Sequence, residues 1–145
     1  MFGMLKLKNR QRGLCRMISP YIEYTENRHG RIASEFWSDP FVLGFFTIAI
    51  SSLAPDDLNS NDHARLQAGC ISDLSQVDHL LVGQWITLLS MSEDDDFMTG
   101  CVHGNAFAEA LRLTADDALV DPEMLPMVDD AALSIWQSSV ETRLA

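Results

Sequence analysis

The side chains in this sequence that could take part in chemistry are few and far apart. Glu26 and His29 have the spacing Glu-x-x-His, which on a helix places a carboxylate and an imidazole one turn apart. Di-iron proteins built on four-helix bundles use two such pairs and two further glutamates, whereas this sequence has one pair. Because the set is incomplete, we interpret the pair as a solvated helix end, where an imidazolium is favoured by the negative helix terminus.

A zinc site is the second chemistry that the residue types suggest. His63 and Cys70 are seven residues apart and share one face of a helix, whereas Cys101 and His103 point to different sides. A structural zinc site needs four ligands, so two on one face are too few, and cysteines that act as small apolar side chains are the better interpretation. No cofactor is expected. The metal-site candidates are weak, and they are Glu26, His29, His63 and His103.

A calcium loop and a phosphate loop are also incomplete or absent. The segment Asp57-Leu58-Asn59-Ser60-Asn61 has the spacing of the first three EF-hand ligands. An EF-hand also needs Gly at position 6 and Glu at position 12, where this sequence has Asp62 and Ala68. We therefore interpret the segment as a polar loop that caps the next helix. The sequence contains neither GxxxxGK[ST] nor GxGxxG, the patterns of phosphate-binding loops.

Charge is distributed unevenly along the 145 residues. Residues 1–31 hold seven basic and two acidic residues, a net charge of +5, whereas residues 32–145 hold three basic and 19 acidic residues, a net charge of −16. An acidic body repels phosphate backbones, so nucleic-acid binding is not expected. The same charge favours solubility and basic protein partners.

The cysteine content favours a reducing compartment. Cys15, Cys70 and Cys101 are odd in number and widely spaced, so they do not form a disulfide framework, and a cytoplasmic location is expected. The longest apolar run, residues 41–50, is shorter than the roughly 20 residues that span a bilayer. We therefore assign it to the core.

The basic residues of the first 18 positions predict an arm. No apolar run of seven or more follows residues 6–12, so a secretory signal is not favoured, while the lack of acid in residues 1–22 leaves a transit peptide open. We expect residues 1–18 to form a partly disordered arm or a short helix, because Pro20 would break a longer one. Contact of this arm with an anionic membrane surface is a less favoured alternative.

The helix signals predict an all-α domain. Asp39-Pro40 starts a helix that runs to about residue 54, before Pro55. A buried strand over 41–50 stays open, since the run is rich in β-formers. In residues 76–91, Val77, Leu81, Trp85 and Leu88 have helical spacing. The expected fold is a compact bundle of about six helices in one domain, residues 19–145, around the central helix; the other helices cover about 20–29, 61–73, 76–91 and 94–113, a short one after Thr114, and a last one from 127–129.

Two stripes of small residues favour a role in protein interaction. Gly44, Thr47 and Ser51 share one helix face, and Gly100, Gly104 and Ala108 share another, so the two helices could pack closely against each other. With no chemical signature, we expect a non-catalytic interaction or regulatory module that binds another protein or itself, for example as a homodimer. The alternative is a metal-binding protein or enzyme whose site is assembled from scattered residues, with Glu26, His29, His63, His79 and His103 as its candidates.

Overall fold

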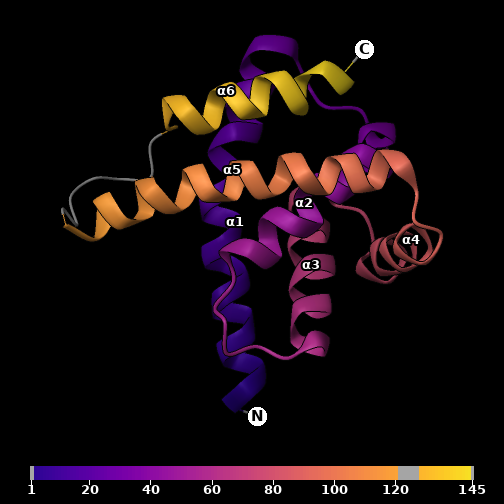
Figure 1. The fold of residues 1–145 in the computed structure, drawn as a ribbon, viewed down its shortest axis with the longest axis vertical. Helices are drawn as coiled ribbons and strands as arrows, with labels where there is room; N and C mark the ends of the chain where they lie inside the picture. The colour runs from indigo at the N-terminus through magenta and orange to yellow at the C-terminus, as the bar shows by residue number, and fades with distance from the viewer. Residues whose placement is uncertain (1, 121–127, 145) are drawn as a thin grey trace.

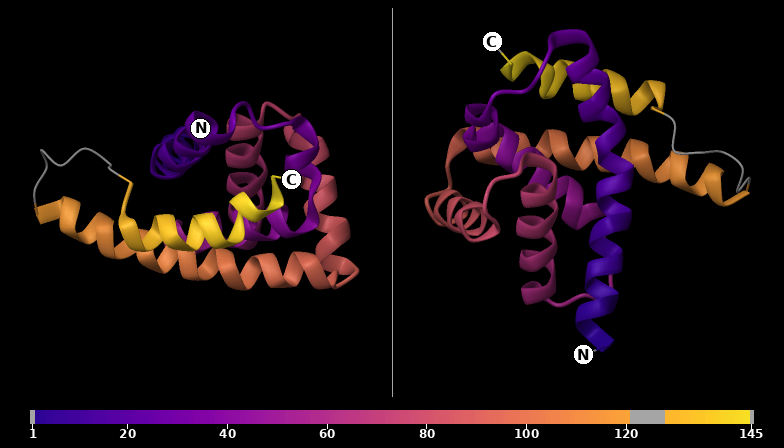
Figure 2. Two further views of the ribbon diagram at one scale, coloured as in Figure 1. Left: turned by 90° about the horizontal axis from the view of Figure 1, so that it is seen from above. Right: turned by 180° about the vertical axis from the view of Figure 1, so that it is seen from behind.

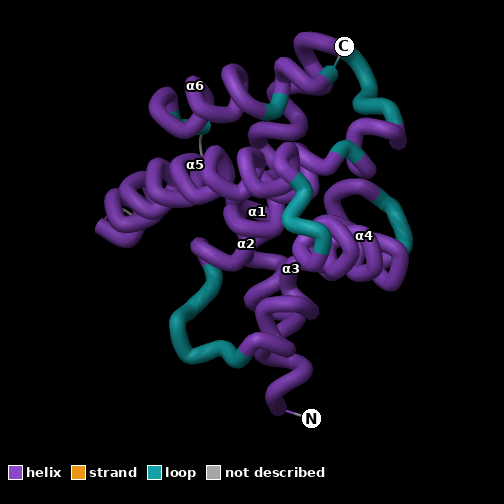
Figure 3. Tube along the Cα trace, turned by 45° about the vertical axis from the view of Figure 1, so that its right-hand side comes forward, coloured by secondary structure: helices purple, strands orange, loops and turns teal. Residues whose placement is uncertain are grey.

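The structure, a computed structural model, describes residues 2–120 and 128–144, and every regular element within them is a helix (Figures 1 and 3). The all-α class is confirmed. No helix in these residues is long and apolar enough to cross a membrane. The elements in chain order are α1 (Phe2–His29), the short 3-10 helix η1 (Ser34–Ser38), α2 (Pro40–Leu53), α3 (Ser60–Ser75), α4 (His79–Met91), α5 (Asp95–Val120), α6 (Asp130–Ser139) and the 3-10 helix η2 (Glu141–Arg143).

Helix α2 is the buried centre of the fold, as predicted, and residues 41–50 are helical. The Asp39 carboxylate accepts a hydrogen bond from the Phe41 amide at 2.8 Å, and Pro40 occupies the first turn. Every residue from 41 to 50 is buried except Ile48, which is half-buried. An isolated helix that is apolar all round would be insoluble, so α2 depends on the surrounding helices to cover it.

The closest packing in the fold joins α2 to α5. A methyl group at Gly44 would clash with the backbone carbonyl of Phe97 on α5, and one at Gly100 with the carbonyl of Phe41 on α2. Gly104 lies in the same way against the carbonyl of Phe45. Each glycine Cα thus faces a carbonyl oxygen of the other helix, the arrangement in which Cα–H···O contacts form. The prediction that the two stripes face each other is confirmed for these glycines.

Helix α1 differs from its prediction, because it continues through Pro20 from Phe2 to His29. Residues 2–18 are therefore part of a long helix rather than an arm. Pro20 cannot donate to the carbonyl one turn earlier, but residues on both sides of it are buried in the core, including Ile18 and Tyr21. Burial on both sides offsets the lost hydrogen bond. Gly30, with a φ of 86°, ends the helix at the predicted position.

The remaining helices begin at polar caps. The side chains of Asn59, Asp78 and Asp129 each accept a hydrogen bond from the first turn of α3, α4 and α6. Helix α4 begins at His79 rather than at 76, because Asp78 is its cap and Gln76 adopts a left-handed conformation. Helix α5 continues past Thr114 to Val120, since no Gly or Pro interrupts it there. The last helix, α6, begins at Asp130, close to its predicted start at 127–129; residues 121–127 lie outside the described residues.

An aromatic cluster joins α6 to the rest of the fold. The indole ring of Trp136 is fully buried, and its centroid lies 5.9 Å from that of Phe45, 5.7 Å from Phe46 and 5.6 Å from Phe107. Tyr21 of α1 packs against the same indole at 5.9 Å. The contacts bring α1, α2, α5 and α6 together, and α6 lies along α5 in two of the views (Figures 1 and 2). Two of the three tryptophans, Trp37 and Trp136, are thus core residues.

Candidate functional site

The structure leaves the predicted metal candidates apart. Glu26 lines a cleft of about 510 Å³ beside Arg31 and Trp37, and His63 lies in the first turn of α3. His103 lies on α5, where its Nδ1 is 2.8 Å from the Ser139 hydroxyl. Within residues 2–120 and 128–144, no group of three or more His, Cys, Asp or Glu side chains is placed to hold a metal ion.

The His103–Ser139 pair resembles part of a catalytic dyad, but its surroundings are those of a structural contact. Ser139 is only 1% exposed, so a substrate cannot reach its hydroxyl. The imidazole packs against the Phe41 ring, with the centroids 5.4 Å apart. The hydrogen bond therefore fastens α6 to α5 near the start of α2.

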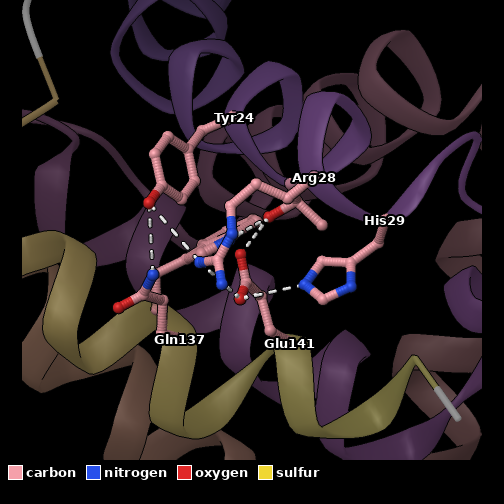
Figure 4. Close-up of polar contacts among 7 residues, drawn as sticks. Tyr24, Arg28, His29, Gln137 and Glu141 are labelled. Atoms are coloured by element: carbon pink, nitrogen blue, oxygen red, sulfur yellow. Dashed lines mark hydrogen bonds and ion pairs between the residues drawn. The ribbon is translucent and has the colours of Figure 1, made fainter.

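His29 belongs to a polar network that joins the end of α1 to α6 and η2 (Figure 4). The Trp136 Nε1–H donates to the Thr25 hydroxyl at 2.7 Å, and this hydroxyl donates to Glu141 Oε1 at 2.9 Å. The other Glu141 oxygen lies 3.4 Å from His29 Nε2 and 3.7 Å from an Arg28 nitrogen. Thr25 is fully buried, and its hydroxyl both accepts and donates a hydrogen bond within the network. The network attaches the end of α1 to the C-terminal segment.

We expect the ion pairs of this network to contribute little on their own. Arg28 and His29 are nearly half exposed, at 47% and 44%, so water screens their attraction to Glu141. Glu141→Gln keeps an oxygen that accepts the Thr25 hydrogen bond, and its stability in urea should stay within about 1 kcal/mol of the wild type. A loss above about 2 kcal/mol would show that the charge itself holds the segment.

Helix α4 carries the most unusual surface of the described residues. Its residues Val82 and Ile86 point into the core, while its opposite side presents Leu80, Leu88 and Met91 at 66%, 66% and 78% exposure. These three lie with Gln84 at helical spacing, and we call this set the outer face of α4. Large apolar side chains on one exposed helix face are typical of an interaction site. The helix lies at the edge of the fold, beside the start of α5 (Figure 1).

Beside this face, a shallow apolar groove separates α4 from the start of α2. It has a volume of about 170 Å³ and is lined by Ser38, Pro40, Leu43, Trp85, Leu88 and Leu89. Trp85 is half-buried here, unlike the two core tryptophans. Leu88 borders both the groove and the outer face, so the two form a continuous apolar surface.

The charged residues in the sequence around this surface are acidic. Between Arg65 and Arg112 the chain has no Lys or Arg, and it has seven acidic residues. Asp78 lies at the start of α4, and Glu93 and residues 94–96 follow its end. An apolar strip with carboxylates at both ends favours a partner that carries cations on either side of an apolar stripe.

The helical spacing in the sequence indicated a different inner face for α4. Leu81 and Leu88 belong to the predicted periodic set, but the structure leaves them 40% and 66% exposed and turns Val82 and Ile86 inward. Because the segment is apolar nearly all round, periodicity cannot select the buried side. The sequence signal for an exposed apolar face is the excess of apolar residues itself, because the 13 residues of α4 include no Asp, Glu, Lys or Arg.

Comparisons of the chain with protein families, curated proteins and solved structures give no match.

Proposed function

We propose that this protein is a non-catalytic interaction module that binds an amphipathic helical segment of another protein on the outer face of α4. The observation that carries the proposal is the exposure of Leu80, Leu88 and Met91 on an uncharged helix. The partner would lay apolar side chains on this face and into the groove at Trp85, and its Lys or Arg residues would lie near Asp78 and Glu93.

The energetics are those of a moderate, reversible complex. Full burial of an exposed Leu or Met side chain contributes about 1.5–3 kcal/mol. Three such side chains contribute an amount comparable with the roughly 4–15 kcal/mol that association costs in lost freedom, so the partner's own apolar residues must supply the net affinity. Charge attraction adds chiefly to the association rate. We expect a dissociation constant on the order of micromolar.

Charge favours a basic partner over a second copy on this face. Two copies of α4 packed antiparallel would bring Asp78 of one copy close to Glu93 and its neighbours in the other. Carboxylates facing each other across an interface repel, and no Lys or Arg in this part of the chain compensates. Self-association through α4 is therefore the alternative outcome that the experiment must distinguish.

Calorimetry with a designed peptide tests the proposal. The probe is a two-heptad helical peptide of Leu and Lys, and its counterpart has Glu in place of Lys. We expect the Leu/Lys peptide to bind the wild type, and Leu88→Glu to weaken it at least about tenfold, or 1.4 kcal/mol. The added carboxylate would strengthen a purely electrostatic contact, so a loss shows that apolar contact is needed.

The control is Leu5→Glu, which introduces the same charge at a site on α1 with matched exposure, 65% against 66%. This variant should bind like the wild type within about twofold. Equal binding of the Leu/Glu peptide, or unchanged binding by Leu88→Glu, contradicts the proposal. A wild-type dimer that Leu88→Glu converts to a monomer would assign the face to a second copy instead.

A further inference from the structure

The packing of α1 on α3 brings together two cysteines that are 55 residues apart in the sequence. The Cys15 sulfur lies 4.0 Å from the carbonyl oxygen of Cys70, and the Cys70 sulfur lies 3.6 Å from the carbonyl oxygen of Gln11. Gly69, next to Cys70, lies against the amide end of the Gln11 side chain, which also comes from α1. The two helices lie side by side in the front and rear views (Figures 1 and 2). Each thiol therefore lies against the backbone turn that carries the other.

The two thiols differ in access. Cys70 is fully buried, whereas Cys15 is only half-buried. The third cysteine, Cys101, lies on α5 and outside this pair. One accessible thiol next to one sheltered thiol is the arrangement in which the first reacts with an oxidant and the second resolves the product.

The effect of each thiol on the pKa of the other adds to this difference. The neighbouring Cys70 thiol lowers the pKa of Cys15, against the opposing effects of burial and Asp73. The neighbouring Cys15 thiol, together with burial, raises the pKa of Cys70. Because the thiolate is the reactive form, Cys15 is the thiol that reacts first.

We propose that Cys15 and Cys70 form a peroxide-sensitive dithiol site, in which oxidation links α1 to α3 through a disulfide. The Cys15 thiolate attacks one oxygen of hydrogen peroxide; an S–O bond forms, the O–O bond breaks, and the second oxygen leaves as water after protonation. Cys70 then attacks the sulfur of this sulfenic acid; the S–S bond forms, the S–O bond breaks, and its oxygen also leaves as water. Two thiols lose two electrons and two protons, and one peroxide becomes two waters.

This site is compatible with the lack of a disulfide framework in the sequence. In a reducing compartment, disulfides are usually transient and redox-sensing rather than structural. Closing the pair would tie the first half of α1 to α3. The site is independent of the outer face of α4, which carries no cysteine.

Mass spectrometry of the reduced full-length protein, treated with hydrogen peroxide, tests the proposal. We expect the intact mass to fall by about 2 Da and to be restored by a thiol reductant. Trypsin would leave Cys15 in residues 13–16 but Cys70 and Cys101 together in residues 66–112, because no Lys or Arg separates them. The linked peptide is therefore mapped in a Cys101→Ser background, which assigns the bond to Cys70.

Two variants make the result decisive. Cys101→Ser should oxidise like the wild type, while Cys15→Ser, at a half-buried position, should fold and no longer lose about 2 Da. A wild type that only gains about 16 Da or multiples of it overturns the proposal, since the sulfenic acid would then be unresolved. A loss of about 2 Da that persists in Cys15→Ser also overturns it.

Discussion

Gly104→Ala is expected to destabilise the protein by about 2–3 kcal/mol, although alanine is normally the better helix former. The added methyl group would clash with the carbonyl of Phe45, and its neighbouring backbone atoms would lie 2.9 and 3.0 Å away. Backbone atoms cannot move aside as the end of a flexible side chain can, so α2 and α5 must separate. Gly104→Leu should prevent the native packing altogether. Urea unfolding followed by circular dichroism measures the effect.

The matched control is Gly13→Ala on α1. An added methyl group at Gly13 meets no atom within 4 Å, so this variant should gain about 0.5–1 kcal/mol from helix propensity alone. The two identical substitutions should thus have opposite signs. If Gly104→Ala is as stable as the wild type, the close approach of α2 and α5 is wrong.

Thr25→Val is the second substitution for which we expect a large loss, about 2–3 kcal/mol. Valine fills the same space but cannot accept from the Trp136 indole or donate to Glu141. The indole N–H would then be buried without a partner, a cost that exceeds the net value of a hydrogen bond that is made. The midpoint of urea unfolding, followed by the near-ultraviolet signal of the aromatic cluster, measures the loss.

Two further threonine variants control this experiment. Thr25→Ser keeps the hydroxyl and loses one methyl group, so it should retain more than half of the stability that valine loses. Thr99→Val on α5 removes an exposed hydroxyl that bonds within its own helix, and should stay within about 0.5 kcal/mol of the wild type. Equal losses for Thr25→Ser and Thr25→Val would show that shape, rather than the hydrogen bonds, matters at this position.

The central helix and its glycine contacts could be predicted because local signals determine them. Asp39-Pro40 marks a helix start in any context, and small residues spaced by four define a face without knowledge of the partner helix. Helix α1 could not be predicted in this way, because the packing of Ile18 and Tyr21 outweighs the local effect of Pro20.

The candidate site could not be predicted from the sequence for a related reason. In an amphipathic helix the sequence pattern indicates which side is buried, but α4 is apolar on both sides. The arrangement of its neighbours alone leaves Leu80 and Met91 exposed. The proximity of Cys15 and Cys70 has no local signal either, since it depends on how α1 crosses α3. The sequence shows which reactive side chains the protein has, whereas the tertiary packing determines which of them lie close together.

Native mass spectrometry of the untagged protein, alone and with the Leu/Lys peptide, tests most directly whether the outer face of α4 binds a basic helix of another protein. Purification without chelator also retains any metal ion or small molecule that is bound. We expect a monomer alone, a 1:1 complex with the Leu/Lys peptide, and no complex for Leu88→Glu. A dimer that excludes the peptide would contradict the proposal and assign the face to a second copy. A stoichiometric metal ion would instead support the alternative function, a metal-binding protein that uses Glu26 and the histidines.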